Sequence, residues 1–163
     1  MENKYILWQF PFSKPNVELP LSSEFRLEIF SPNKFNLRKY RFGSLPMYVF
    51  WRIFTEYKIV YITHNNELAH VNHVLRGYWK FPFMEEKDYV IGPAYTFPKY
   101  RRMGLYKASM SAIIKFVRIN SIDSKIYIFA HIDNVPSNKA IEKMGFLKVG
   151  FLKKDRFGKY MII

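Results

Sequence analysis

The sequence predicts a domain of the α/β or α+β class, in which helices pack on a mixed sheet. Short runs rich in β-branched and aromatic residues recur from residue 25 to the C-terminus. Two segments in the second half, 104–119 and 136–144, instead carry apolar residues at helical spacing. Elements that alternate in this way bury their apolar faces against one another in layers. We expect about six to seven strands and about four helices.

The first third of the chain predicts two strands and two helices. Residues 1–24 contain three prolines after residue 10 and are expected to form a short strand followed by an irregular arm. Phe25–Phe30 alternates apolar and polar residues, as a half-buried strand does. Ser31-Pro32 and Ser44-Leu45-Pro46 each resemble a helix start, with serine as the N-cap, and predict helices to about Tyr40 and through Phe54.

The middle of the chain predicts a hairpin and a further strand. Tyr57–Thr63 is a strand by composition, His64–Glu67 supplies turn residues, and Leu68–Tyr78 is the partner strand. Tyr89–Phe97 is the next strand, but Gly92-Pro93 interrupts it. Because proline cannot donate a ladder hydrogen bond, this strand is expected to be bulged or unpaired on one side there.

The last third alternates helices and strands. Residues 104–119 form the clearest helix, with an apolar stripe that includes Leu105, Ile113 and Val117. The remaining elements, in order, are a strand at 125–131, a helix at 136–144 closed by Gly145, and strands at 146–152 and 159–163.

The composition limits the classes of function that the chain can have. The chain has 163 residues with 49% hydrophobic ones, which predicts one globular domain over 1–163. It has no cysteine, which excludes disulfides and cysteine-ligated metals and fits a cytoplasmic protein. No apolar run reaches the roughly 20 residues that span a bilayer. Lysine and arginine outnumber aspartate and glutamate by 26 to 13, a net charge of +13 that favours anionic partners unless it reflects compositional bias.

A basic turn between a predicted strand and the clearest helix is the main candidate site. It runs from Tyr95 to Lys107 and contains one glycine, Gly104. Backbone N–H groups are unpaired at a helix start, and the helix dipole is positive there, so such a turn can hold a phosphate. Arg101, Arg102 and Lys107 add positive charge. The turn therefore predicts binding of the pyrophosphate of a nucleotide-like cofactor.

Two motifs at a fitting distance from each other resemble the GCN5-related N-acetyltransferase (GNAT) family. Arg101-Arg102-Met103-Gly104-Leu105-Tyr106 fits the Arg/Gln-x-x-Gly-x-Gly/Ala loop of that family except at its last position. Asn134 to Gly145-Phe146 matches the Asn-containing helix of the family that closes with Gly-Phe. The resemblance covers roughly residues 25 to 163. It implies a mixed, mostly antiparallel sheet whose central strands splay apart, and a single acyl-CoA N-acyltransferase domain.

The resemblance also implies a cofactor, acetyl-CoA or another acyl-CoA. Free backbone groups of the splayed strand would hold the pantetheine arm and the thioester carbonyl, and main-chain N–H groups of the loop would hold the pyrophosphate. The residues expected to contact the cofactor are Ala94, Tyr95, Thr96, Arg101, Arg102, Met103, Gly104, Leu105, Tyr106, Lys107, Asn134 and Ser137.

Three positions depart from the family pattern. Tyr106 stands where the loop normally ends on a small residue. Ile141 stands where many members have a tyrosine acid, and Phe129 where some have a glutamate base. The catalytic acid and base of the family therefore have no counterpart at these two positions of the sequence.

The candidates for proton transfer come from the residues themselves. His131 ends a strand just before Asn134, and its unperturbed pKa suits base chemistry, although a surface or capping histidine is the plainer alternative. Ser137 and Tyr95 are candidate acids, with helix capping and sheet packing as their alternatives. His70 and His73 are expected on opposite faces of the hairpin, so no metal site is predicted.

The predicted reaction is direct attack of a primary amine on acetyl-CoA. The acceptor is expected to be a small amine or a nucleotide-linked amino sugar, because the N-terminal half is basic and aromatic and Lys34, Arg38, Lys39 and Arg41 form a basic cluster. A solvated helix face is the slightly favoured explanation of that cluster. The alternatives are acetylation of a protein N-terminus or lysine, and a non-catalytic module that binds CoA or RNA. Nucleic acid is the less favoured partner, since no RNA-binding motif is present. The sequence is compatible with both a homodimer and a monomer.

Overall fold

The computed structural model describes residues 4–15, 18–32, 55–77, 79–121 and 123–163. The strands are β1 (Lys4–Phe10), β2 (Phe25–Phe30), β3 (Tyr57–His64), β4 (Glu67–Arg76), β5 (Tyr89–Thr96), β6 (Ile126–His131), β7 (Leu147–Lys154) and β8 (Tyr160–Ile162). The helices are the 3₁₀ turn η1 (Pro98–Tyr100), α3 (Leu105–Asn120) and α4 (Val135–Lys143). The helices expected between Pro32 and Phe54, and the basic cluster from Lys34 to Arg41, lie outside the described residues.

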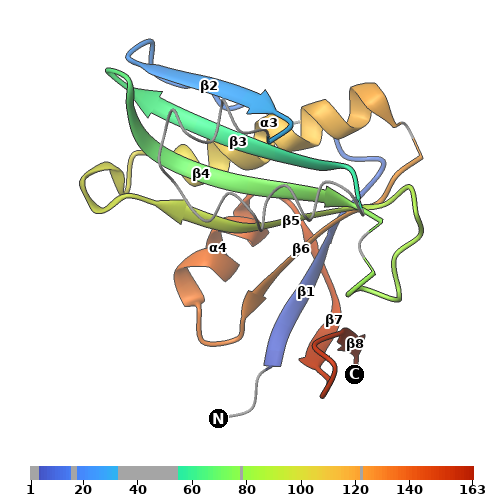
Figure 1. The fold of residues 1–163 in the computed structure, drawn as a ribbon. Helices are drawn as coiled ribbons and strands as arrows, with labels where there is room; N and C mark the ends of the chain where they lie inside the picture. The colour runs from blue at the N-terminus through green and yellow to red at the C-terminus, as the bar shows by residue number, and fades with distance from the viewer. Residues whose placement is uncertain (1–3, 16–17, 33–54, 78, 122) are drawn as a thin grey trace.

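One sheet joins all the strands in the order β2-β3-β4-β5-β6-β1-β7-β8 (Figure 1). Neighbouring strands are antiparallel, except that β5 and β6 run parallel. The structure therefore confirms a mixed, mostly antiparallel sheet of the α+β class. The described residues form eight strands, where six to seven were predicted, and two α-helices; the other two of the four expected helices lie outside the described residues.

The N-terminal strand lies inside the sheet, where β1 pairs with β6 on one side and with β7 on the other. Leu7, Trp8 and Phe10 of this strand are buried. Figure 1 shows β1 running between β6 and β7, far from the next strand in sequence, β2. The sequence predicted a strand here but not its place, because nothing local specifies a partner more than 100 residues away.

Apolar residues cover both faces of the sheet. One core cluster contains Ile113 and Val117 of α3 and Ile141 of α4, so it lies on the face that carries the two helices. A second cluster lies on the other face and includes a set of aromatic rings that pack edge-on or stacked, namely Tyr5, Phe81, Phe129 and Tyr160. Among the described residues, no helix is long and apolar enough to cross a membrane.

The sheet opens between β5 and β6. Their parallel pairing ends at Ile91 and Ile128, although both strands continue beyond these residues. At the same place the register between β4 and β5 shifts between Asn72 and Val74, and the Gly92–Pro93 peptide bond is cis. This agrees with the bulge that the sequence predicted at Gly92-Pro93. The edges of β5 and β6 that face each other are therefore without a strand partner from there on.

Candidate functional site

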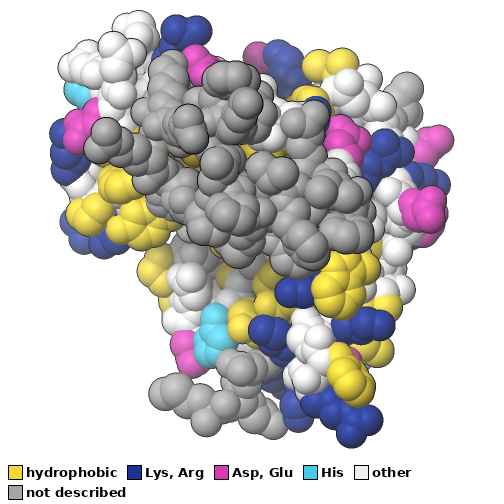
Figure 2. All heavy atoms as spheres, viewed as in Figure 1, with side chains coloured by type: hydrophobic (Ala, Val, Ile, Leu, Met, Phe, Trp, Pro, Cys, Tyr) yellow, Lys and Arg dark blue, Asp and Glu magenta, His cyan; other side chains and the backbone are white. Residues whose placement is uncertain are grey.

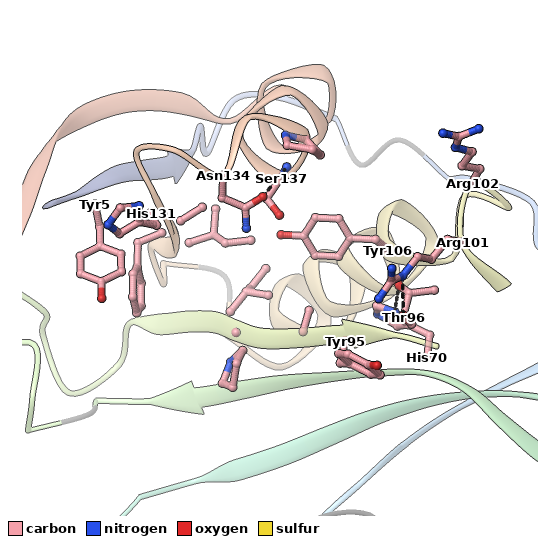
Figure 3. A pocket seen from close by; sticks show the side chains of 18 residues that line it. Tyr5, His70, Tyr95, Thr96, Arg101, Arg102, Tyr106, His131, Asn134 and Ser137 are labelled. Atoms are coloured by element: carbon pink, nitrogen blue, oxygen red, sulfur yellow. Dashed lines mark hydrogen bonds between the residues drawn. The ribbon is translucent and has the colours of Figure 1, made fainter. Parts of the chain in front are cut away.

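A pocket of about 800 Å³ lies where β5 and β6 separate (Figure 3). It extends from the turn before α3 at one end to Tyr5 and His131 at the other. Residues from β1, β4, β5, β6, α3 and α4 line it: Tyr5, His70, Ile91, Gly92, Pro93, Ala94, Tyr95, Thr96, Arg101, Arg102, Tyr106, Ile128, Phe129, Ala130, His131, Asn134, Pro136 and Ser137.

The turn at one end of the pocket is shaped by η1 and by a glycine. Gly104 precedes α3 in the left-handed conformation, with φ of 77°, and the direction in which a Cβ would point is empty to 4 Å. The helix starts without a side-chain N-cap and without an acidic residue in its first turn. Its first N–H groups and the positive end of its dipole therefore remain available to an anion.

Contacts with β4 and β5 hold this turn in place. The Tyr100 hydroxyl donates to Glu67 Oε2 over 2.8 Å, and the Lys99 ammonium contacts the same oxygen. Arg101 Nε donates to the Thr96 carbonyl oxygen over 3.3 Å. Arg101 and Arg102 are exposed and line the pocket. The charge of Lys99 is thus paired, whereas the two arginines are the cations at the pocket mouth.

The other expected loop residues do not line the pocket with their side chains. Leu105 is buried in a core cluster with Tyr100 and Ala108, and Met103 is exposed. Met103, Gly104, Leu105 and Lys107 are absent from the pocket lining. Their main chain forms the turn and the start of α3 between Arg102 and Tyr106, which do line the pocket.

The first turn of α4 borders the pocket on the β6 side. Asn134 Oδ1 accepts the backbone N–H of Ser137 over 3.3 Å and so caps the helix. With its oxygen used in this way, the amide nitrogen of Asn134 can donate to the pocket. Asn138 fixes the turn before Asn134 by donating to the carbonyl oxygens of His131 and Ile132, and its own Oδ1 accepts from Trp8 Nε1 over 3.2 Å.

A chain of buried polar side chains lies beneath the β5 wall. His70 Nδ1 is 2.7 Å from Thr96 Oγ1, and His70 Nε2 is 2.9 Å from Ser109 Oγ. Asn72 Nδ2 donates to Ser109 Oγ over 3.0 Å, and that hydroxyl donates to the Tyr106 carbonyl over 2.8 Å. Burial lowers the pKa of His70 to about 4, so this ring is neutral at pH 7.

The other hairpin histidine faces away from this chain. His73 Nδ1 lies 2.5 Å from the Tyr57 hydroxyl, and its ring stacks on that of Tyr57. Burial also lowers its pKa to about 4. The two histidines thus lie on opposite faces of β4, as their spacing predicted. Among the described residues, no three His, Asp or Glu side chains are grouped to hold a metal.

Tyr106 reaches across the pocket from the first turn of α3. In Figure 3 its hydroxyl points toward the start of α4, where Asn134 and Ser137 lie. Burial raises the pKa of Tyr106, so the hydroxyl remains protonated. Among the described residues no group is hydrogen-bonded to this hydroxyl. The sequence placed Tyr106 among the residues expected to contact the cofactor, but it did not predict that the hydroxyl extends across the pocket toward α4.

His131 lies at the opposite end of the pocket. Its Nδ1 accepts the backbone N–H of Asp133 over 3.3 Å, and Tyr5 packs edge-on against its ring, 5.4 Å between centroids. The same Nδ1 also lies 3.5 Å from Asp133 Oδ2. The ring can therefore present either a hydrogen-bond donor or an acceptor to a ligand at this end of the pocket.

Tyr95 and Ser137, the two predicted acids, lie on different sides of the pocket. The Tyr95 ring packs edge-on against Phe97, and in Figure 3 it lies on the side of β5 away from Tyr106. Ser137 faces the pocket from α4, and only its backbone N–H takes part in the helix cap. Ile141 is fully buried in the core, and Phe129 belongs to the aromatic cluster with Tyr5.

Tyr5 and His70 line the pocket although the sequence assigned them no role in it. The alternation of Tyr57–Thr63 and its partner strand could place His70 on the helix-facing side of the hairpin. No local signal could place Tyr5, because its position depends on the insertion of β1 between β6 and β7.

Comparison with known proteins gives the same fold. The profile of the acetyltransferase (GNAT) family matches residues 27–146. A search of curated proteins found no match to the sequence. Among solved structures, the chain is similar to a GCN5-related N-acetyltransferase from Sphaerobacter thermophilus, with 8% identity and a TM-score of 0.65, over 92% of this chain and 50% of the other.

Two further structures have a similar fold. An acetyltransferase of the GNAT family from Colwellia psychrerythraea is 12% identical, with a TM-score of 0.64, over 91% of this chain and 53% of the other. An aminoglycoside N-acetyltransferase in complex with CoA is 12% identical, with a TM-score of 0.59, over 76% of this chain and 92% of the other. For other matched structures the chain spans 49% to 62% of their length.

Proposed function

Because the chain belongs to the acetyltransferase (GNAT) family, we propose that it transfers an acetyl group from acetyl-CoA to a primary amine. Acetyl-CoA is the donor of this family, and when bound it supplies a thioester carbonyl open to attack by an amine. The observation that carries the proposal is the pocket itself. It brings together Arg101 and Arg102, Tyr106 from the first turn of α3, and an opened strand edge in one cavity, and the uncapped start of α3 lies between the arginines and Tyr106 in sequence.

The residues present fit a CoA ester. The turn around Gly104 leaves room for a phosphate next to the first N–H groups of α3, and Arg101 and Arg102 add positive charge. The unpaired edge of Ala94, Tyr95 and Thr96 offers backbone groups to an amide-containing arm and to a carbonyl oxygen. The Asn134 amide nitrogen adds a donor from the opposite wall.

We propose that Tyr106 donates the proton that the leaving sulfur takes up. Its hydroxyl is protonated, enters the pocket and is without a partner among the described residues. Ser137 is next to it on the first turn of α4 and can relay or donate in the same region. Tyr95 is the weaker candidate because its ring lies on the other side of β5. The backbone N–H of Tyr95 or of Thr96 remains the proposed donor to the carbonyl oxygen during attack.

The acceptor end of the pocket is aromatic. Tyr5, Phe129 and His131 line it, and their rings contact one another at near-perpendicular angles. The apolar C–H face of a pyranose ring can pack against such a wall while His131 Nε2 donates to one of the sugar oxygens. We therefore propose a small amine or a nucleotide-linked amino sugar as acceptor. A protein N-terminus or lysine is the alternative.

A non-catalytic CoA-binding module is the second candidate. Two observations favour it: Ile141 is buried where the family often has its acid, and Phe129 packs in an aromatic cluster where some members have a base. In that case the pocket would bind the cofactor without turnover.

The test combines binding with turnover. Calorimetry and thermal unfolding are measured with acetyl-CoA, CoA and a single-stranded RNA, followed by a thiol-release assay over amino sugars, nucleotide-linked amino sugars, small amines and peptides. Acetyl-CoA is expected to raise the melting temperature and to release thiol with one acceptor class. Stabilisation by CoA without release for any acceptor would favour the binding module. Stabilisation by RNA alone would refute both readings.

A further inference from the structure

Ser109, on the buried face of α3, determines which atoms donate and which accept in the series of hydrogen bonds beneath β5. Its Oγ lies 2.8 Å from the Tyr106 carbonyl oxygen, which can only accept. Two oxygens this close repel unless a proton lies between them, so the single hydroxyl proton of Ser109 points to that carbonyl. The Ser109 oxygen must then accept from its other two neighbours, Asn72 Nδ2 at 3.0 Å and His70 Nε2 at 2.9 Å.

This arrangement selects one tautomer of His70. Its Nε2 carries the proton that is donated to Ser109. The ring is fully buried, and its pKa of about 4 keeps it neutral, so it has no second proton. His70 Nδ1 must therefore accept, and its partner at 2.7 Å is the hydroxyl of Thr96. Thr96 is the donor in that hydrogen bond.

The Thr96 hydroxyl consequently turns its proton away from the pocket and its lone pairs toward it. Thr96 is half-buried and lines the pocket, and among the described residues no group donates to its oxygen. We infer that Thr96 Oγ1 accepts an amide N–H from the pantetheine arm of the acyl donor, and that His70 is the positioning residue that keeps this hydroxyl an acceptor. Without His70 the hydroxyl could rotate and equally well donate to a carbonyl oxygen.

The place of Thr96 favours the arm over the other parts of the donor. It is the last residue of β5, and its carbonyl oxygen accepts from Arg101 at the mouth of the pocket. Thr96 is thus the residue of the opened strand edge nearest to the turn assigned to the phosphates. The pantetheine arm, which connects the phosphates of the donor to its thioester, carries amide N–H groups. The inference rests on the proposed function for the presence of this donor.

The test measures binding affinity by calorimetry for CoA and for adenosine 3′,5′-bisphosphate, which lacks the arm. Thr96→Val removes the hydroxyl with little change in shape and is expected to weaken CoA binding about fivefold. Binding of the bisphosphate should stay within about twofold of wild type, because it makes no use of the hydroxyl. Thr96→Ser keeps the hydroxyl and should bind CoA about as wild type does.

Two substitutions of His70 separate positioning from folding. In His70→Asn the side-chain oxygen lies near the place of Nδ1 and can still accept from Thr96, so CoA affinity should be retained. His70→Gln instead reaches toward Ser109 and leaves Thr96 without its partner, so it should weaken CoA binding to about the extent of Thr96→Val. Melting temperatures of all four variants report any loss of fold.

Each result decides the inference. Equal CoA affinity in wild type and Thr96→Val overturns it and leaves the proposed function untouched. Equal weakening of CoA and of the bisphosphate also overturns it, because Thr96 would then act through the fold of the turn. A higher KM for the amine with an unchanged CoA affinity assigns the N–H to the acceptor and overturns the assignment to the arm. Failure of wild type to bind CoA refutes the proposed function, and this inference with it.

Discussion

At the scale of single residues, Gly104 is the position where a side chain would conflict with the proposed phosphate site. Its φ of 77° strains any residue with a Cβ, at a cost of about 1 kcal/mol. A Cβ there would meet no atom within 4 Å in the protein, so the fold should tolerate it. Gly104→Val is expected to lower CoA affinity at least tenfold, measured by calorimetry, while the protein still unfolds cooperatively. Unchanged affinity would show that phosphates bind elsewhere.

Tyr106 tests the source of the proton that the leaving sulfur needs. Tyr106→Phe keeps the ring that crosses the pocket and removes only the hydroxyl, so CoA affinity should change little. General acids typically contribute about 10²–10⁴ in rate, and we expect kcat to fall by about 10². The measurement is steady-state thiol release with the acceptor found in the screen. If kcat keeps its wild-type value, Ser137 or water supplies the proton, and Ser137→Ala is the variant to compare.

Substitutions of His131 test whether its side chain acts as a hydrogen-bond donor or as a base. Its Nδ1 lies near both the backbone N–H and the carboxylate of Asp133, so Nε2 can either donate to a ligand, which is the proposed role, or take up a proton. His131→Gln retains an amide donor and is expected to keep most of kcat/KM, whereas His131→Ala should lose about tenfold. Equal losses in the two variants would argue that the imidazole takes up a proton, since neither glutamine nor alanine can act as a base.

At the scale of elements, β1 connects the sheet to the helix that borders the pocket. Trp8 Nε1 donates to Asn138 Oδ1, and Asn138 in turn holds the carbonyl oxygens of His131 and Ile132. The strand therefore affects the site in two ways: Tyr5 lines the pocket directly, and Trp8 supports the turn that presents Asn134.

A double-mutant cycle measures this connection. Trp8→Phe removes one hydrogen bond and some buried surface and should lower the free energy of unfolding by about 1–2 kcal/mol. Asn138→Ala should cost a similar amount, because it removes the donor to the partly buried His131 carbonyl and the acceptor of the Trp8 indole N–H. The two costs should not add, with a coupling of about 0.5–1 kcal/mol in urea denaturation. Additive costs would mean that β1 and α4 are stabilised independently.

At the scale of the whole molecule, two buried histidines link folding to pH. His70 and His73 each have a pKa of about 4 in the folded protein, against an ordinary value of 6.5. Below pH 6.5 the unfolded chain binds protons that the folded chain does not, so stability is full above that pH and falls as the pH decreases toward 4. The loss is on the order of 3 kcal/mol for each ring.

Urea denaturation at several pH values between 7 and 4.5 tests this linkage. His73→Asn should reduce the pH dependence, whereas the same substitution at surface-facing His64 should leave it largely in place. A free energy of unfolding that stays level down to pH 4.5 would show that these rings are not buried as the structure has them.

Figure 2 shows how the charged side chains are distributed on one face of the molecule. Lysine and arginine side chains there are interspersed with acidic and hydrophobic ones instead of forming one block. Part of the basic charge is also locally paired, as in the Lys115–Glu18 and Lys125–Glu85 contacts. The described basic side chains on this face therefore form no continuous track of the kind that binds nucleic acid.

Local sequence determined the elements and the two ends of the candidate site. The apolar periods of α3 and α4, the alternation of β2 and the break at Gly92-Pro93 all depend on residues close in the chain, and the structure has these elements within one to two residues of the expected bounds. The basic turn and the Asn134 to Gly145-Phe146 block are local motifs as well. For this reason the sequence sufficed to indicate the GNAT family and its acyl-CoA donor.

Tertiary structure alone decided which distant residues meet. The insertion of β1 between β6 and β7, the alignment of His70 with Thr96 and Ser109, and the reach of Tyr106 across the pocket each join residues that are separate in sequence or in element. The hydrophobic periodicity of an element predicts which of its faces is buried. It does not predict which other element packs against that face, because many partners would bury it equally well. Strand order and the direction of each hydroxyl proton therefore follow only from the folded geometry.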